Sequence, residues 1–132
     1  MKIRLAILMA LCAAPAYSQW GDSGPTLVFF DWGKGELSND SKASLDKIAD
    51  AYRQAARPMT VDGHSDRSGA APTNLRSSRK RAETVRDYLI GKGVAGSAIR
   101  VRAYGESWSI IATADGVREV QNRRVEVRWS TP

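Results

Sequence analysis

The stretch GHSDRSG, residues 63–69, brings potentially reactive side chains together, because the only histidine, His64, is followed by Ser65 and Asp66. A Ser-His-Asp triad needs the histidine held by a carboxylate against a nucleophile, yet adjacent residues of a strand point to opposite faces. One histidine without cysteine partners is also a poor metal site, although carboxylates could complete one. We therefore expect His64 to pack against a strand neighbour or a polar loop group and to shape the turn.

Hydrophobic periodicity predicts the elements that position this stretch. Four segments alternate in the manner of strands or are rich in β-branched and aromatic residues: 26–32, 59–64, 99–105 and 124–129. Two segments between them have apolar residues at helical spacing, 38–56 and 74–93, with Ser38 or Asn39 as a possible N-cap and Gly91 and Gly93 as stop signals. The predicted order is strand, helix, strand, helix, strand, strand, and the only long loop is 106–122.

The GHSDRSG stretch follows the second predicted strand and leads into the second predicted helix. Unpaired backbone N–H groups at the start of a helix point outward and favour anions. The sequence therefore places the polar groups of residues 63–69 where a ligand could be held.

The N-terminus has the layout of a secretory signal, with Lys2 and Arg4 before an apolar run and small residues before Gln19. We expect residues 1–18 to be a signal peptide cleaved after Ser18, or less favourably after Ala16, followed by a short segment, 19–25, and one domain, 26–130. Lipidation of Cys12, the only cysteine, is the alternative, but Leu11 precedes it where a small residue is needed. Removing Lys2 and Arg4 from 20 basic residues leaves 18 against 14 acidic ones, a net charge of +4.

The motif from Val61 to Val94, VDGHSDRSG followed by N, S, RKRAETV, L and GV, resembles the peptidoglycan-associating signature of the OmpA-like C-terminal domain family. The resemblance continues in VFFDWGKGELS upstream and in Gly105-Glu106 and NRRVEV (122–127) downstream, so it covers about residues 26–130. It implies an α/β two-layer sandwich, β-α-β-α-β-β, with two helices on a four-stranded mixed sheet.

The resemblance also implies a function, which is non-covalent and non-catalytic binding of diaminopimelate-type peptidoglycan in the Gram-negative periplasm. By position in the motif, Asp66 corresponds to the aspartate that takes the ammonium of diaminopimelate, and Arg81 to the arginine that takes the carboxylate. Asn74 and Ser65 match supporting polar positions. This assignment is chemically consistent, because the zwitterionic end of diaminopimelate needs one acceptor for its ammonium and one forked donor for its carboxylate.

Three further residues are candidates for a supporting role at the site: Asp31, Gly69 and Arg124. Without the motif, Asp66 would be an ordinary turn or cap residue, and Arg81 sits in a basic run that would usually be a solvated face. Asp31 ends the first predicted strand at a position typical of the family, where it would either hold the loop of the pocket or only form a turn. Arg124 is expected mainly to pair with carboxylates near the sheet. The sequence departs from the family pattern at two points: Ser77 stands in place of a leucine, and no proline follows Gly105-Glu106. Because of the missing proline, the family pattern does not predict the conformation of loop 106–122.

Two other classes of function remain as alternatives. A wall hydrolase would need a nucleophile, a metal cluster or a carboxylate pair, and none is visible, so we expect no enzyme, no metal and no cofactor. An OmpA-like protein-interaction module that no longer binds peptidoglycan would keep the fold without the site, and an envelope protein partner is possible in either case. Nucleic-acid binding is not expected, because no reading motif accompanies the basic residues, and the mature chain is expected to have no transmembrane segment.

Overall fold

The computed structural model describes residues 24–130, so the predicted signal peptide, Cys12 and most of the segment 19–25 lie outside the described residues. The elements in chain order are β1 (Thr26–Phe29), α1 (Asn39–Gln54), β2 (Met59–His64), α2 (Ala71–Gly91), the short η2 (Gly96–Ala98), β3 (Ile99–Gly105), the short η3 (Val120–Asn122) and β4 (Arg124–Trp129). The predicted order of strands and helices is confirmed.

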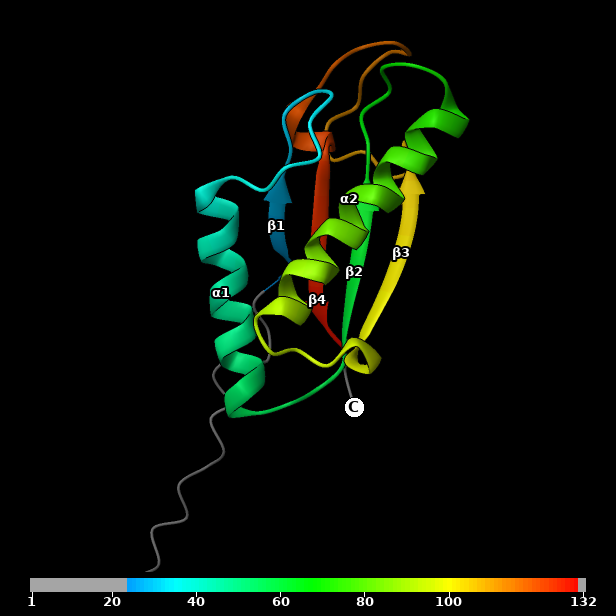
Figure 1. The fold of residues 1–132 in the computed structure, drawn as a ribbon. Helices are drawn as coiled ribbons and strands as arrows, with labels where there is room; N and C mark the ends of the chain where they lie inside the picture. The colour runs from blue at the N-terminus through cyan, green and yellow to red at the C-terminus, as the bar shows by residue number, and fades with distance from the viewer. Residues whose placement is uncertain (1–23, 131–132) are drawn as a thin grey trace, which may run out of the picture.

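The four strands form one mixed sheet in the order β1-β4-β2-β3, in which β4 is antiparallel to β1 and β2, and β2 is parallel to β3. Both helices cover the same face of this sheet (Figure 1). A parallel pair needs a crossover connection, and α2 supplies it between β2 and β3. The predicted α/β two-layer sandwich is thus confirmed.

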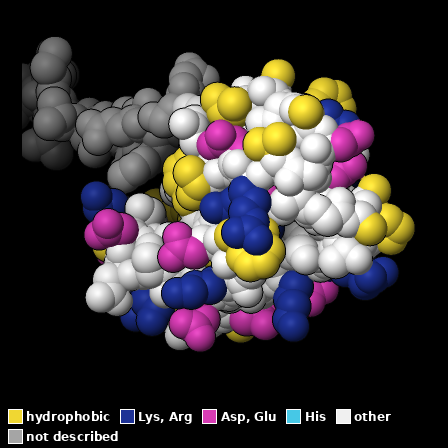
Figure 2. All heavy atoms as spheres, turned by 90° about the horizontal axis from the view of Figure 1, so that it is seen from above, with side chains coloured by type: hydrophobic (Ala, Val, Ile, Leu, Met, Phe, Trp, Pro, Cys, Tyr) yellow, Lys and Arg dark blue, Asp and Glu magenta, His cyan; other side chains and the backbone are white. Residues whose placement is uncertain are grey.

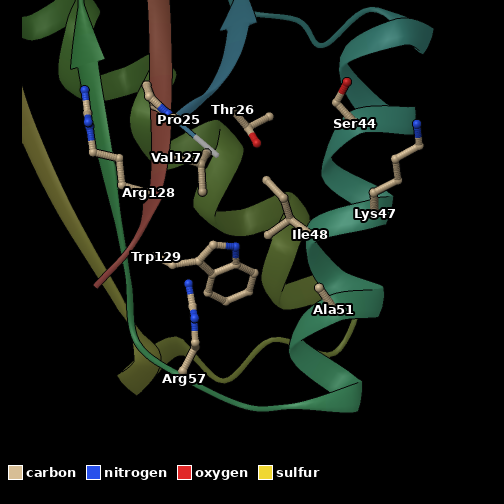
Figure 3. Close-up of a pocket in the computed structure, with 11 residues that line it drawn as sticks. Pro25, Thr26, Ser44, Lys47, Ile48, Ala51, Arg57, Val127, Arg128 and Trp129 are labelled. Carbon is tan, nitrogen blue, oxygen red and sulfur yellow. The ribbon is translucent and has the colours of Figure 1, made fainter. Parts of the chain in front are cut away.

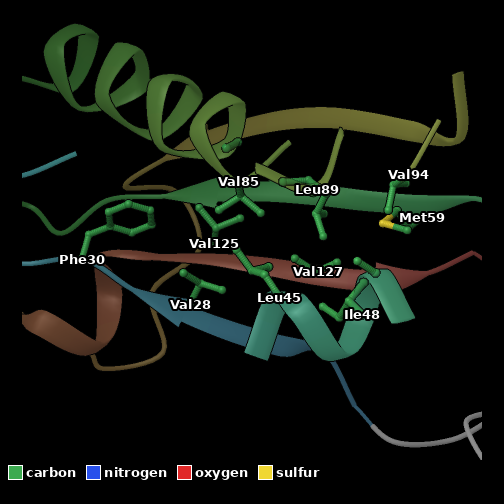
Figure 4. Close-up of a cluster of buried hydrophobic side chains, with 13 residues drawn as sticks. Val28, Phe30, Leu45, Ile48, Met59, Val85, Leu89, Val94, Val125 and Val127 are labelled. Atoms are coloured by element: carbon green, nitrogen blue, oxygen red, sulfur yellow. The ribbon is translucent and has the colours of Figure 1, made fainter. Parts of the chain in front are cut away.

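The core lies between the helices and the sheet, as expected for strands with one buried face. Val61 on β2 and Val125 and Val127 on β4 point toward the helices and are buried. Figure 4 shows Val125 and Val127 packed with side chains from both helices, among them Leu45 and Leu89, and Val61 belongs to the same cluster. Intervening residues of the strands point to the other face, which neither α1 nor α2 covers.

Local signals fix the ends of both helices. The Ser38 hydroxyl accepts a hydrogen bond from the Ser41 backbone N–H at 3.1 Å, so the predicted N-cap of α1 is confirmed. Helix α2 ends at Gly91, close to the predicted stop, but it begins at Ala71 instead of about 74, because Pro72 is compatible with the first turn. Strand β1 is shorter than predicted, since Asp31 starts a turn in which its carbonyl accepts from the Lys34 N–H.

Helix α2 packs very closely on the end of β2 because Gly63 has no side chain. A Cβ atom at Gly63 would lie 1.9 Å from the Ser78 carbonyl oxygen. Ser78 is itself bonded to the next strand, since its hydroxyl accepts from the Gly105 N–H at 3.0 Å. The first half of α2 is thereby fixed against the ends of β2 and β3.

The long loop after β3 folds over the end of the sheet and is held there by side chains. Asn122, fully buried, accepts from the backbone N–H groups of Ile110 and Ile111 and donates to the Ile111 carbonyl. Arg67 donates to the Thr113 carbonyl at 2.9 Å. In residues 24–130 no helix combines the length and apolar character that crossing a bilayer requires.

Candidate functional site

A cavity of about 420 Å³ lies at the end of the molecule where β2 ends and α2 begins. The loops after β1, β2 and β3 meet there, at the top of Figure 1. Figure 2 looks down on this end and shows Lys and Arg side chains near the middle of the face, with acidic and hydrophobic side chains around them. The predicted residues that line the cavity are Ser65, Asp66, Gly69, Asn74 and Arg81.

Asp66 lies in the cavity wall with only 2% of its surface exposed. Its Oδ1 accepts from the Ser68 N–H at 3.1 Å and the Ser68 hydroxyl at 2.5 Å, while its Oδ2 accepts from Arg123 Nη1 at 2.7 Å and the Glu119 N–H at 3.2 Å. Burial alone would raise the pKa of this carboxyl, but the hydrogen bonds from Ser68 and Arg123 outweigh it and lower the pKa. Asp66 is therefore a fixed negative charge.

Arg81 reaches the same cavity from α2 and is only 8% exposed, whereas its neighbours Arg79 and Lys80 are exposed. Among residues 24–130 its guanidinium makes no hydrogen bond, and it lies 5.7 Å from the centre of the Phe30 ring. Burial and the nearby positive charge of Arg123 lower the pKa of Arg81, while Asp66 opposes this shift. Arg81 is thus a buried cation whose guanidinium N–H groups are available to a ligand.

The supporting polar positions also meet at the cavity. Asn74 donates through Nδ2 to Glu106 Oε2 at 2.8 Å and to the Gly69 carbonyl at 3.4 Å, which leaves its Oδ1 without a donor in the described part of the chain. Gly69 has a φ of 84°, a left-handed conformation that favours glycine in this turn. The Ser65 hydroxyl donates to the Asp66 carbonyl at 3.0 Å, so Ser65 holds the loop.

The structure adds Arg123, which the sequence interpretation passed over in favour of Arg124. Arg123 is buried and lines the cavity beside Asp66, whereas Arg124 points to the helix-free face and donates to Glu126 Oε1 at 3.0 Å. The pairing of Arg124 with a carboxylate is as expected, but the structure does not bring it to the cavity. Alternation could have identified the right arginine, because Arg123 is two residues before the inward-facing Val125.

Asp31 is likewise not brought to the cavity, since it is exposed and forms a turn. Its neighbour Trp32 lines the rim instead and donates through Nε1 to the Ser68 hydroxyl at 3.2 Å. The Arg118 guanidinium lies 3.5 Å from the centre of the Trp32 ring. Neither Trp32 nor Arg118 was predicted, because only the folded loops place them together.

His64 does not face this cavity. Its ring stacks on Tyr104 of the neighbouring strand, with 5.3 Å between ring centres and 13° between planes, as expected for packing against a strand neighbour. Burial, and next the charge of Arg124, lower the pKa of His64 from 6.5 to about 4. No group of three or more His, Cys, Asp or Glu side chains suited to a metal ion occurs within residues 24–130.

Another hollow, of about 360 Å³, lies at the opposite end of the sheet between α1 and the ends of β1 and β4 (Figure 3). Trp129 and Ile48 contribute apolar surface there, and the Arg57 guanidinium lies 4.8 Å from the centre of the Trp129 ring. None of the predicted site residues lines this hollow. The cavity beside Asp66 and Arg81 is therefore the candidate functional site.

Comparison with known proteins places this geometry in a family. The chain is 37% identical over 109 residues to an outer membrane protein of Gluconacetobacter diazotrophicus, covering 76% of this chain and 29% of that protein. It is 33% identical over 98 residues to the peptidoglycan-associated lipoprotein of Rhizobium meliloti, covering 74% of this chain and 56% of that protein. The chain thus spans only about a third to a little over half the length of these relatives.

The solved structure of the peptidoglycan-associated lipoprotein from Burkholderia pseudomallei matches with a TM-score of 0.70 and 26% sequence identity, covering 79% of this chain and 89% of that one. These relatives are named as an outer membrane protein and peptidoglycan-associated lipoproteins, and none of the names is that of an enzyme, in agreement with the expectation that the chain is not an enzyme. The model of the OmpA family matches residues 29–123, from the end of β1 to the arginine that pairs with Asp66. Because this match takes in most of the chain and every element of the site, the chain belongs to the OmpA family.

Proposed function

We propose that this chain binds peptidoglycan non-covalently in the periplasm, by holding the free end of a diaminopimelate residue of the stem peptide in the cavity between Asp66 and Arg81. The observation that carries the proposal is the buried Arg81 guanidinium, which lines a cavity and lacks a hydrogen-bond acceptor in the described residues. Two relatives are named peptidoglycan-associated lipoproteins, which supports the same class of ligand.

Arg81 would take the carboxylate of the diaminopimelate end. A guanidinium presents planar, paired donors that match a carboxylate, and such a pair is stronger when water is excluded. The loop end also carries the cations Arg118 and Arg123, but Arg123 is occupied by Asp66 and Arg118 lies over Trp32. Arg81 is thus the guanidinium best placed to form a new ion pair in the cavity.

The ammonium of the same end would face Asp66 and Asn74. Both oxygens of Asp66 already accept two hydrogen bonds, so the ammonium can bond to Asp66 only by displacing one of these donors. The Ser68 hydroxyl is the donor easiest to replace, because it belongs to a partly exposed turn residue. Asn74 Oδ1 offers an acceptor that needs no displacement.

The test is a calorimetric titration with matched stem peptides that carry diaminopimelate, its amide, or lysine, at physiological salt. Lysine keeps the ammonium but leaves Arg81 unpaired, and removing one partner of a buried charge pair costs roughly 2 to 5 kcal/mol. We therefore expect lysine-type peptide to bind about 30-fold more weakly or worse, and the amide to be weakened in the same direction. Equal affinity for all three peptides would refute the proposed recognition.

Arg81→Ala and Arg79→Ala form a matched pair for the same titration. Arg81→Ala should abolish the preference for diaminopimelate, whereas Arg79, exposed and two residues earlier on α2, should leave it intact. If the net positive charge merely held an anionic polymer, both variants would weaken binding slightly and added salt would remove it. A salt-resistant preference lost only in Arg81→Ala supports the proposal.

One observation favours a second function, docking of an envelope protein partner. The loop after β3 exposes several large apolar side chains: Trp108, Ile110, Ile111, Val117 and Val120. A group of exposed apolar residues often marks a protein contact. In whole cells, Ile110→Ser with Ile111→Ser should reduce cross-linking to an envelope protein without changing wall binding, and unchanged cross-linking would argue against this second function.

A further inference from the structure

A separate cavity of about 350 Å³ lies on the helix-free side of the sheet, and none of its lining residues lines the cavity beside Asp66. His64 and Tyr104 form part of it, at the ends of β2 and β3. The loop after β3 contributes Trp108, whose carbonyl accepts from Arg124 Nη2 at 3.1 Å. Residues from three strands and a loop therefore line one cavity that stem-peptide binding does not use.

Three buried nitrogen atoms in this lining have no hydrogen-bond partner within the described residues: His64 Nδ1, His64 Nε2 and Arg124 Nη1. His64 is only 4% exposed, and the nearest carboxylate oxygen, Glu126 Oε2, is 3.8 Å from its Nε2, too far for a hydrogen bond. Buried polar atoms are nearly always satisfied, so an unpartnered group of this kind requires an explanation such as a ligand or ordered water. A neutral imidazole offers one donor and one acceptor, and Arg124 adds a donor.

The charges of the lining balance one another. Glu126 pairs with Arg124 at 3.0 Å and with Arg128 at 3.1 Å, and Asp62 pairs with Arg102 at 2.7 Å. Because each carboxylate already has a guanidinium partner, the unused hydrogen-bonding capacity lies mainly in the imidazole and one guanidinium N–H. Such a lining suits a neutral ligand that both donates and accepts, which is the chemistry of a hydroxyl or acetamido group.

Trp108 can add an apolar wall, because this residue lines the cavity and 65% of its surface is exposed. An indole is a large and rigid surface that other groups can stack on. Sugar rings present one face of C–H groups together with hydroxyl groups at the edge, so they fit a wall of this kind beside unsatisfied polar atoms. Binding sites for small molecules commonly combine apolar walls with a few convergent polar groups in this way.

We propose that this cavity binds one pyranose ring of a neutral glycan, stacked on Trp108 with its polar substituents bonded to His64 and Arg124. The site goes beyond the proposed function, since it would add contact with sugar to contact with the stem peptide. The glycan site shares no residue with the proposed stem-peptide site. Experiments can therefore refute either site without refuting the other.

The test is an NMR titration of the full chain with chitotriose, a soluble and neutral N-acetylated glycan. We expect saturable shifts at the Trp108 indole, His64 and Tyr104, with the signals of Asp66 and Arg81 unmoved. Trp108→Ala should weaken binding about tenfold, equivalent to about 1.4 kcal/mol. Phe29→Ala is the matched control, because Phe29 is also an exposed aromatic residue of the helix-free side, 41% exposed, and does not line this cavity.

His64→Phe gives a second variant that keeps a ring against Tyr104 but removes both nitrogen atoms, and it should also weaken chitotriose binding. Maltotriose, which lacks acetamido groups, shows whether the hydroxyl groups are enough. Absence of saturable shifts, or shifts that Trp108→Ala leaves unchanged, would mean that water alone satisfies these atoms and would overturn the proposal. Arg81→Ala should abolish stem-peptide binding and leave chitotriose binding intact, which separates failure of one site from failure of the other.

Discussion

Arg123 Nη1 lies 2.7 Å from Asp66 Oδ2, and both side chains are buried at the wall of the candidate site. Arg123 also donates through Nε to the Phe30 carbonyl at 3.1 Å, so one guanidinium joins the ends of β1 and β4 to the loop after β2. Asp66 therefore helps to hold these segments together through its ion pair with Arg123, in addition to any contact with a ligand. Arg81 has no such internal partner among residues 24–130, which makes the two predicted ligand residues physically unlike.

Replacing Arg123 with leucine should destabilise the fold strongly. Breaking a buried ion pair leaves the other charge uncompensated and typically costs about 3 to 5 kcal/mol. The measurement is the free energy of unfolding from urea denaturation at neutral pH. Arg128→Leu is the control, because Arg128 is half-exposed and pairs with Glu126 near the surface, so its loss should cost less than about 1 kcal/mol.

Replacing Arg81 with alanine should separate binding from stability. Its guanidinium is desolvated without an internal hydrogen bond, so its removal should change the free energy of unfolding by less than about 1 kcal/mol, while stem-peptide binding is lost. In the titration described above, this loss appears as diaminopimelate-type peptide binding no more tightly than lysine-type peptide, and the same urea experiment measures the free energy of unfolding. If Arg81→Ala unfolds the protein as severely as Arg123→Leu, then Arg81 is a structural residue and not a binding one.

Replacing Ser68 with alanine tests how Asp66 meets an ammonium. The Ser68 hydroxyl accepts from Trp32 and donates to Asp66, so it competes with a ligand for Asp66 Oδ1. If the ammonium displaces this hydroxyl, Ser68→Ala should bind stem peptide as tightly as the wild type or more tightly. A clear loss of affinity in calorimetry would instead show that Ser68 itself contacts the ligand.

Replacing Gly63 with alanine should harm both the fold and the site. The added Cβ would lie 1.9 Å from the Ser78 carbonyl oxygen, so α2 would have to move away from β2, which costs about 1 to 3 kcal/mol or more. This movement would displace Arg81 relative to Asp66 and weaken stem-peptide binding. Gly91→Ala is the control, since a Cβ there meets no atom within 4 Å, and it should be neutral or slightly stabilising.

Stability should fall as the pH is lowered from 6.5 toward 4. Burial lowers the pKa of His64 to about 4, so in this range the unfolded chain binds a proton at His64 that the folded chain does not. The loss is at most roughly 3 kcal/mol, at 1.36 kcal/mol for each pH unit between the two pKa values. His64→Phe should flatten the dependence of the unfolding free energy on pH in this range.

The two carboxylates with lowered pKa values, Asp66 and Glu126, affect stability mostly at lower pH. Arginine partners and hydrogen bonds lower the pKa values of Asp66 and Glu126 below 3.8 and 4.5 in spite of burial, so their stabilisation is lost only as the pH falls below those values. The charged groups around His64 are Asp62 on β2, Arg102 on β3, and Arg124, Glu126 and Arg128 on β4. An unchanged pH profile in His64→Phe would show that these groups, and not His64, govern the decline.

The order of the main elements, most of their bounds, and the family could be predicted from the amino-acid sequence. Strands β2, β3 and β4 begin and end where alternation predicts, since period-two patterns depend only on which face is buried. The ordered motif also selected Arg81 from a basic run, although helical geometry alone could not distinguish it from its neighbours. The alternation of a strand involves only neighbouring residues, and the motif has a fixed spacing along the chain. Both can therefore be recognised in the linear sequence.

Which polar groups contact one another could not be predicted from the sequence, because these contacts form between distant segments of the folded chain. Asp66 and Arg123 are 57 residues apart, and their contact depends on how loops from three strands fold over one end of the sheet. The choice of Arg123 over Arg124 depends on which face of β4 looks toward the helices. Whether the Arg81 guanidinium has an internal hydrogen-bond partner depends on where the acceptor atoms of the described residues lie in the folded chain. These distances cannot be read from the linear order of residues.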